Sequence, residues 1–228
     1  MKRFLICFGL LGGLFLQVVS AQSPSFLNDL KGVMLNLDLE HVRDGLIPSK
    51  SFYPLSVPLD TLKIQPVDGR PVLVFKEHQG LDVPPSSLLD PGGKEWVVTV
   101  RFFAQTDGVI LQHANEHVGY TLRIEDGAVE VILHSDGEDV FLRESADRGI
   151  TSCLKKWMIL EIHIQPDQAM LVLNRAHVAR VPLKRSLFGT DFHLRLGQPK
   201  IFAPLREDHP EYPRGFSGGL STLKFLRQ

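Results

Sequence analysis

The sequence predicts an all-β fold, and three observations carry that prediction. Short apolar stretches alternate with period two, which places every second side chain on a common face. Turn-forming residues, chiefly Gly, Pro and Asp, separate these stretches. Helical periodicity is scarce, and only residues 86–89 and 185–188 are expected to form single turns. Roughly a dozen strands at this spacing indicate a sandwich or a barrel and not βαβ units.

In the first half of the chain the strands are short. Leu35, Leu37 and Leu39 alternate with polar residues and therefore share one apolar face. Asp44-Gly45 and Pro48 mark a loop, and Pro84-Pro85 ends a strand. The expected strands here are residues 33–39, 62–64, 72–75 and 81–83, with a turn at 68–71 between the second and third.

The middle and end of the chain carry the clearest strands, rich in β-branched and aromatic residues. Asp126-Gly127 is typical of a tight hairpin turn. Trp96 and Trp157 lie within apolar strands, so both are expected in the core. The expected strands are residues 96–103, 109–113, 119–124, 129–133, 157–164, 169–173, 192–197 and 220–226.

The N-terminus has the layout of a secretory signal peptide. Lys2 and Arg3 precede an almost wholly apolar run, and Val19-Ser20-Ala21 supplies small residues before a cleavage point. The apolar run is short beside the roughly 20 residues of a membrane span. The expected organisation is a signal peptide at 1–21, a spacer at 22–32 and one β domain at 33–228. The mature chain is expected to be secreted or periplasmic, with no membrane span.

Charge and cysteine content exclude several classes of protein. The chain has 25 basic and 26 acidic residues, and loss of Lys2 and Arg3 with the leader changes the formal net charge from −1 to −3. This balance gives no basic surface for nucleic acid. Only Cys153 survives processing, so no intramolecular disulfide is possible, and a buried thiol is expected.

No catalytic or metal-binding pattern stands out. Acidic residues occur near predicted turns (Glu125, Asp126, Glu130, Glu138, Asp139 and Glu144), and solvated turn charges are the expected interpretation. His113 and His117 are four apart, a spacing that suits a metal on a helix, but this segment joins two strands. We expect it to be an exposed loop.

The predicted recognition surface is the long proline-rich loop of residues 199–215. Long loops without secondary structure in compact domains are often functional. Its candidate ligand-binding residues are an aromatic ring for stacking on a sugar and charged groups for its hydroxyls: Tyr212, Arg206, Glu207, Asp208 and Arg214. The alternative is that the prolines only stiffen a crossover connection.

The order of these elements resembles the laminin-G-like and concanavalin-A-like jelly rolls, in their bacterial exported type. The resemblance spans residues 33–228. It rests on Leu35-Asn36-Leu37-Asp38-Leu39 with Gly45, Pro71 to Phe75 followed by Gly80 to Pro84, Gly108 to Leu111, Gly119 to Leu122, Asp126-Gly127, Trp157 before Glu161 to Ile164, Leu194 to Gly197, and Phe216 to Gly219. It implies a two-sheet antiparallel jelly-roll sandwich.

The chain departs from these families at two kinds of site. Calcium-binding members carry an Asp before the central hairpin strand, where this chain has His117-Val118. Asp191 alone does not make a calcium site, so no cofactor is expected and calcium is doubtful. Laminarinase-like members carry Glu-x-Asp-x-x-Glu on one strand, and the spacing of Glu125, Asp126 and Glu130 does not reproduce it.

These features favour an exported, non-catalytic binding or adhesion module whose ligand is a polysaccharide or an extracellular protein. Fold does not determine function, so two alternatives stay open. One is a glycan-processing hydrolase of the same superfamily. The other is a structural β domain of a larger exported complex.

Overall fold

The fold is seen in a computed structural model of the chain. Its described residues are 32–51, 55–76, 78–86, 89, 93–115, 117–135, 138–144, 152–184, 187, 193–199 and 214–228. They belong to one compact unit, Gly32–Gln228. The expected leader, and the expected spacer up to residue 31, lie outside the described residues. Within the described ranges, no helix has the length and apolar character needed to cross a membrane.

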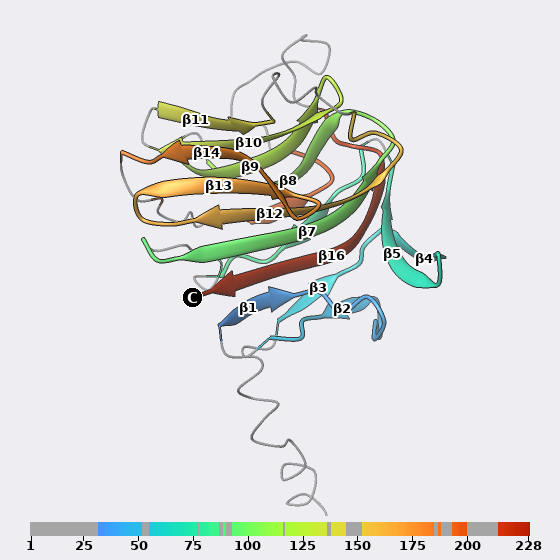
Figure 1. The fold of residues 1–228 in the computed structure, drawn as a ribbon. Coiled ribbons are helices and arrows are strands. Elements are labelled where there is room, and N and C mark those ends of the chain that lie inside the picture. Colours follow the sequence, from blue (N-terminus) through green and yellow to red (C-terminus); the bar gives the residue numbers. More distant parts are fainter. Residues whose placement is uncertain are drawn as a thin grey trace, which may run out of the picture. The chain divides into compact units, whose positions relative to one another are not determined.

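The larger of the two main sheets has eight strands (Figure 1). Seven follow one another in the order β14 (Ala176–Pro182), β13 (Gln168–Leu173), β12 (Trp157–Ile164), β7 (Trp96–Ala104), β16 (Gly218–Arg227), β5 (Arg70–Phe75) and β4 (Lys63–Val67). The eighth strand, β1 (Val33–Asn36), pairs with β16. All of these pairings are antiparallel.

The second sheet has six strands, also antiparallel. Their order is β11 (Glu138–Arg143), β10 (Ala128–Ser135), β9 (Val118–Glu125), β8 (Gly108–Ala114), β15 (Leu194–Leu196) and β6 (Leu81–Val83). A separate pair joins β2 (Leu46–Pro48) and β3 (Ser56–Pro58). The predicted two-sheet antiparallel sandwich is therefore confirmed.

The core lies between the inner faces of the two main sheets. Alternate residues of β7 and β9 point inward, so Phe102 and Leu122 belong to the same buried cluster. Trp96 is fully buried, with its ring edge-on to Phe225 at 5.7 Å between centroids. Cys153 is also fully buried, as expected, and burial raises the pKa of its thiol.

β16 changes neighbours along one of its edges. Its start pairs with β5 through Gly218–Leu220, and its end pairs with β1 through Lys224–Leu226. On its other edge it pairs with β7 throughout, and the register shifts between Leu220 and Thr222, so Ser221 is an extra residue. Such a bulge redirects the side chains around it. The fork between β5 and β1 and the bulge occur at the same point of β16.

Several sequence predictions need correction. Trp157 is only half-buried, because it lies on the outer face of β12 in phase with Glu161 and His163. Residues 138–143 and 176–182 form β11 and β14, which the sequence did not predict, and Leu46–Pro48 is a short strand and not part of a loop. His113 is not in an exposed loop, because it is a buried residue of β8.

Candidate functional site

A pocket of about 300 Å³ opens where β1 and β5 share the edge of β16. We call it the junction pocket. Its lining is mostly polar and comes from the end of β1, the turn after it, the start of β5, and the neighbouring parts of β7 and β16. The lining residues are Asn36, Leu37, Asp38, Leu39, Glu40, Lys50, Arg70, Pro71, Arg101, Ser221 and Thr222.

One wall of the junction pocket is acidic and is neutralised by its own neighbours. The side chain of Asp38 is 6% exposed, and its Oδ2 lies 3.0 Å from Lys50 Nζ and 2.8 Å from His41 Nδ1. Its Oδ1 accepts the backbone N–H of Glu40 at 3.2 Å. Burial by itself raises the pKa of Asp38, but the hydrogen bonds from Lys50, Glu40 and His41 and the charge of Lys50 outweigh it, so the net pKa is lowered. Asp38 is therefore a fixed carboxylate.

A second part of the lining, called the basic wall, is built around Arg101. Its Nη1 donates to Ser221 Oγ at 3.1 Å, so the extra residue of the bulge holds the guanidinium. The guanidinium carbon lies 4.4 Å from the ring centroid of Trp157, a cation–π distance. A methyl group at Gly219 would lie 2.5 Å from Val72 Cγ1 and 3.9 Å from Trp157 Cη2, so the glycine lets these side chains pack onto the strand.

Arg70 adds a second guanidinium to this wall. Burial lowers the pKa of Arg101, the positive charge of Arg70 lowers it further, and the negative charge of Asp68 offsets part of this shift. Among the described residues, no carboxylate lies within 4.0 Å of Arg70 or Arg101. The basic wall thus keeps its charge, whereas the acidic wall is compensated.

The acidic wall also contains the metal-ligating group found among the described residues. One ligand atom from each of Asp38, Glu40 and His41 lies within 4.8 Å of the others. Lys50 Nζ, however, is 3.0 Å from Asp38 and 3.9 Å from Glu40. An ammonium at this position neutralises the carboxylates that a hard cation needs, and the group is better described as an ion-pair network.

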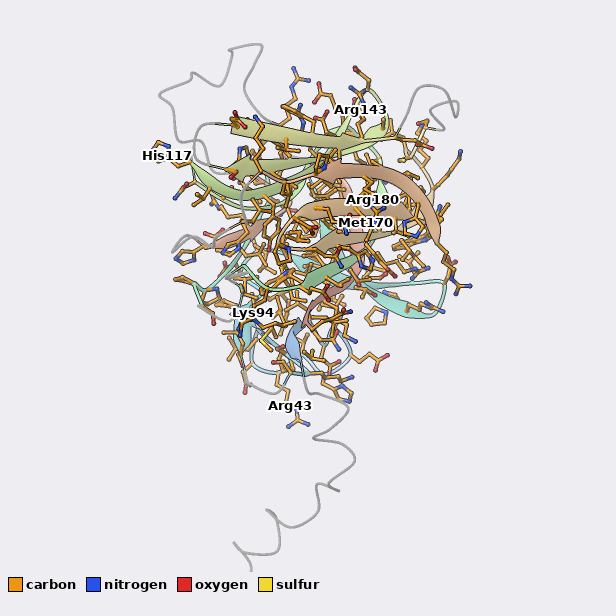
Figure 2. The ribbon with its side chains drawn as sticks, turned by 60° about the vertical axis from the view of Figure 1, so that its left-hand side comes forward. Arg43, Lys94, His117, Arg143, Met170 and Arg180 are labelled. Atoms are coloured by element: carbon orange, nitrogen blue, oxygen red, sulfur yellow. The ribbon has the colours of Figure 1, made fainter. Side chains whose placement is uncertain are left out.

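A second hollow, of about 370 Å³, lies at the far edge of the same sheet. It is lined by Met170, His177, Val178, Ala179 and Arg180. Met170 and Arg180 face each other across β13 and β14 (Figure 2). Its lining is mainly apolar, and it lacks the opposed charges of the junction pocket.

The predicted loop site falls mostly outside the described residues. This applies to Arg206, Glu207, Asp208 and Tyr212. Arg214 is described and exposed, and its carbonyl accepts the Val109 N–H at 2.8 Å. The structure therefore places one of the five residues, beside β8, and it does not line the junction pocket.

The acidic residues near turns are more ordered than expected. Glu130 is a buried residue of β10, and its Oε2 lies 2.6 Å from Nη2 of Arg123 on β9. Glu138 and Asp139 lie on β11, where Asp139 is 2.8 Å from His134. The prediction of solvated turn charges is wrong for Glu130 and holds for Asp126, which is 83% exposed in the hairpin turn.

The position at which related folds carry a calcium-binding Asp does not suit calcium here. His117 stands there, and its backbone N–H donates to Asn115 Oδ1 at 2.8 Å. The N–H of Val118 donates to the same oxygen at 2.7 Å. The amide oxygen is thus committed to the turn, and imidazole is not a calcium ligand. Asp191 lies outside the described residues.

Comparison with known proteins supports the fold alone. No family model and no curated protein matches the chain. Among solved structures, the chain is similar to the botulinum neurotoxin serotype D binding domain, with a TM-score of 0.61 and 13% identity over 86% of this chain and 48% of that one. The binding domain of botulinum neurotoxin DC in complex with SialylT gives a TM-score of 0.60 and 9% identity, over 86% of this chain and 47% of that one.

Two further structures complete this comparison. The binding domain of botulinum neurotoxin DC in complex with rat synaptotagmin II matches at a TM-score of 0.60 and 11% identity, over 86% of this chain and 48% of that one. Domains LG4-5 of the mouse laminin alpha1 chain match at 0.48 and 19% identity, over 67% and 41%. The chain spans about half the length of the toxin binding domains it matches. What they share with it is the β-sandwich.

Proposed function

We propose that the chain is an exported, non-catalytic binding module for carbohydrate, and that the sugar binds in the junction pocket. The observation that carries the proposal is the arrangement of the pocket lining. The carboxylates of Asp38 and Glu40 and the guanidiniums of Arg101 and Arg70 line the same pocket, and Asp38 and Arg101 are each held by contacts of their own. A sugar ring presents both hydroxyl donors and acceptors, and side chains held by other contacts lose little freedom when it binds. Structural neighbours described as binding domains add support for a binding role.

Binding is favoured over hydrolysis by the position of Lys50. Retaining glycosidases need two carboxyl groups about 5–5.5 Å apart across the bond that is cleaved. In the junction pocket both carboxylates are within 4.0 Å of one ammonium, at 3.0 Å for Asp38 and 3.9 Å for Glu40. The lowered pKa of Asp38 suits a hydrogen-bond acceptor and opposes the protonated carboxyl that a general acid requires.

A depletion assay tests this proposal. The full-length chain is incubated with neutral and acidic polysaccharides, soluble and insoluble, with and without calcium, and both bound protein and reducing ends are measured. We expect binding without release of reducing ends and without dependence on calcium. Release of reducing ends that tracks the purified chain would identify a hydrolase instead. Binding to none of the saccharides would overturn the proposal in favour of a protein ligand.

Two variants decide where the sugar binds. Arg101→Gln changes the junction pocket, and Tyr212→Ala changes the loop that the sequence predicts as a recognition surface. We expect Arg101→Gln to weaken binding at least tenfold and Tyr212→Ala to change it less than twofold. The reverse pattern would move the site to the loop of residues 199–215.

A further inference from the structure

The two arginines of the junction pocket differ from those of the second sheet. On the six-stranded sheet, Arg123, Arg143 and Arg195 each have a carboxylate oxygen within 4.0 Å, at 2.6, 3.5 and 2.7 Å. Arg70 and Arg101 have none among the described residues. Two guanidiniums therefore line one pocket without a salt bridge to a described carboxylate, and Asp68 acts on Arg101 through its charge alone.

Arg101 is held in place although it lacks an anionic partner. Ser221 Oγ accepts one of its N–H groups, and the Trp157 ring supports the guanidinium at 4.4 Å. The Ser221 bulge that supplies the oxygen lies on β16, an interior strand of the sheet. A positioned guanidinium presents two parallel N–H donors, a geometry that matches carboxylate and sulfate oxygens.

The surrounding face has the same sign of charge. The strands of the eight-stranded sheet carry several basic side chains on their outer face. Among the described residues of these strands, Glu161 is the one outward-facing carboxylate, and it lies 3.0 Å from His163. The outward basic residues are Lys63, Arg70, Arg101, Arg180 and Lys224. Such a face attracts anions by long-range electrostatics.

The acidic wall selects among anionic ligands. Asp38 and Glu40, paired with Lys50, offer no attraction to a ligand that carries only negative charge, such as an acidic peptide. They accept hydrogen bonds from hydroxyl groups, and the side chains of Ser221 and Thr222 add further polar contacts. An acidic sugar residue combines an oxyanion for one wall with hydroxyls for the other. A pocket of about 300 Å³ is at the lower end of the range for small ligands and suits a single residue of a polymer.

We infer that the junction pocket recognises the oxyanion of an acidic saccharide, a carboxylate or a sulfate, between Arg70 and Arg101. This inference rests on the proposed function and narrows its ligand from carbohydrate to acidic carbohydrate. Asp38 and Glu40 receive the hydroxyls of the same sugar residue. Arg101 is the main anchor, because Ser221 and Trp157 fix its position. Arg70 contacts the oxyanion from the solvent side.

The test compares ligands that differ only in charge. The full-length chain is titrated calorimetrically with polygalacturonate and with its fully methyl-esterified form, which keeps the backbone and masks each carboxylate. Dextran sulfate and dextran make the same comparison for sulfate, and poly-L-glutamate serves as an acidic peptide. We expect at least one of the two acidic polysaccharides to bind at least tenfold more tightly than its uncharged counterpart. A difference for polygalacturonate identifies a carboxylate as the oxyanion, and a difference for dextran sulfate identifies a sulfate.

Matched variants assign the effect to the pocket. Arg101→Gln and Arg70→Gln are expected to reduce affinity for the acidic polysaccharide at least tenfold and fivefold. Arg101→Lys keeps the charge but loses the paired donors, and it should bind with intermediate affinity. Arg180→Gln removes the same charge from β14 at the far edge of the sheet and is expected to stay within twofold of the parent chain. Arg70 is exposed, so its variant reports on binding even if Arg101→Gln unfolds.

Several results would overturn the inference, and they separate it from the proposed function. Equal affinity for the charged and uncharged polysaccharides would refute acid recognition while leaving a carbohydrate-binding module. Poly-L-glutamate binding as tightly as the acidic polysaccharides would indicate an acidic peptide instead. An equal loss of affinity in Arg180→Gln and Arg101→Gln would show that binding depends on the overall positive charge of the sheet and not on the junction pocket. Binding of no saccharide would refute the inference and the proposed function together.

Discussion

Asp38 is nearly buried, yet its surroundings favour the ionised form. Burial opposes ionisation, but Lys50, the Glu40 amide and His41 supply hydrogen bonds that outweigh it, so the pKa lies below the ordinary 3.8. A carboxyl whose pKa is lower in the folded state stabilises the fold at pH values above its unfolded pKa. That contribution is lost as the pH falls through the folded-state value. The contribution of Asp38 to the stability of the fold around the junction pocket therefore depends on pH.

Asp38→Asn is expected to lower the free energy of unfolding by about 1–2 kcal/mol at pH 7, because a neutral amide loses charge-assisted hydrogen bonds. The difference from the parent chain should shrink as the pH falls below 3.8. Urea unfolding at several pH values measures it. Glu40→Gln is the control, because Glu40 is 65% exposed and its loss is expected to cost less than about 0.5 kcal/mol. A constant difference between the parent and Asp38→Asn down to pH 2 would contradict this account.

Trp157 shows what single-residue reading of the sequence misses. β12 has apolar residues on both faces, so its sequence predicts that the tryptophan within it belongs to the core. The sequence did contain a signal for the outer position of Trp157. It lies an even number of residues from the polar Glu161 and His163 and therefore on their face of the strand, whereas the buried residues occupy the alternate positions. The ring supports Arg101 on the outer face instead. Cys153 posed no such ambiguity, and its burial was predicted correctly.

At the scale of elements, strands with one buried face were predicted well, and four strands with few buried residues, β2, β3, β11 and β14, were missed. β7, β9 and β10 alternate clearly, since the inner face of each packs in the core. β14 has no buried residue and β11 has only Leu142, so neither strand shows the apolar alternation on which the prediction depends. β2 and β3 are three residues long and end in proline. Such edge strands are defined by backbone pairing with a neighbour.

The pairing of β9 with β10 contains a buried ion pair. Arg123 and Glu130 are directly opposite, and Glu130 Oε2 lies 2.7 Å from Nε and 2.6 Å from Nη2 of Arg123. Arg123→Met should lower the free energy of unfolding by about 2–4 kcal/mol, because it leaves a buried carboxylate without its partner. Thermal and urea unfolding measure the loss.

The double variant Arg123→Met with Glu130→Gln removes the stranded charge. We expect it to recover most of the lost stability and to lie within about 1 kcal/mol of the parent chain. If the double variant were less stable than Arg123→Met, the pair would be stabilising through packing and not through charge compensation.

At the scale of the whole molecule, the fold was predictable and the junction pocket was not. Chain order and turn spacing sufficed for an antiparallel sandwich. The pocket combines residues from β1, the turn after it, β5, β7 and β16, and only the folded sheet brings them together. No local motif marks such a site. The one sequence signal was a charged residue, Arg101, within the apolar strand β7.

The N-terminal segment carries a prediction about the whole chain. Its charged start, apolar run and small residues at 19–21 are typical of an export signal, so the exported protein should begin at Gln22. Intact mass and N-terminal sequencing of protein recovered from the exported fraction check this. Lys2→Glu with Arg3→Glu should reduce export, because the positive n-region is lost. A full-length mass in the exported fraction would contradict cleavage.

The position of β16 also sets when the domain can fold. This strand, residues 218–227, lies inside the larger sheet between β7 and the β5–β1 edge, and it joins Val33 to Leu226. A ribosome therefore synthesises the other strands of the domain before β16, which joins β7 to β5 and β1. Until then β5 and β1 have nothing to pair with on that side, and closure requires contacts between residues almost 200 positions apart. Folding dominated by such distant contacts is slow. Slow folding keeps a chain unfolded for longer, which is the state that the proposed export across a membrane requires.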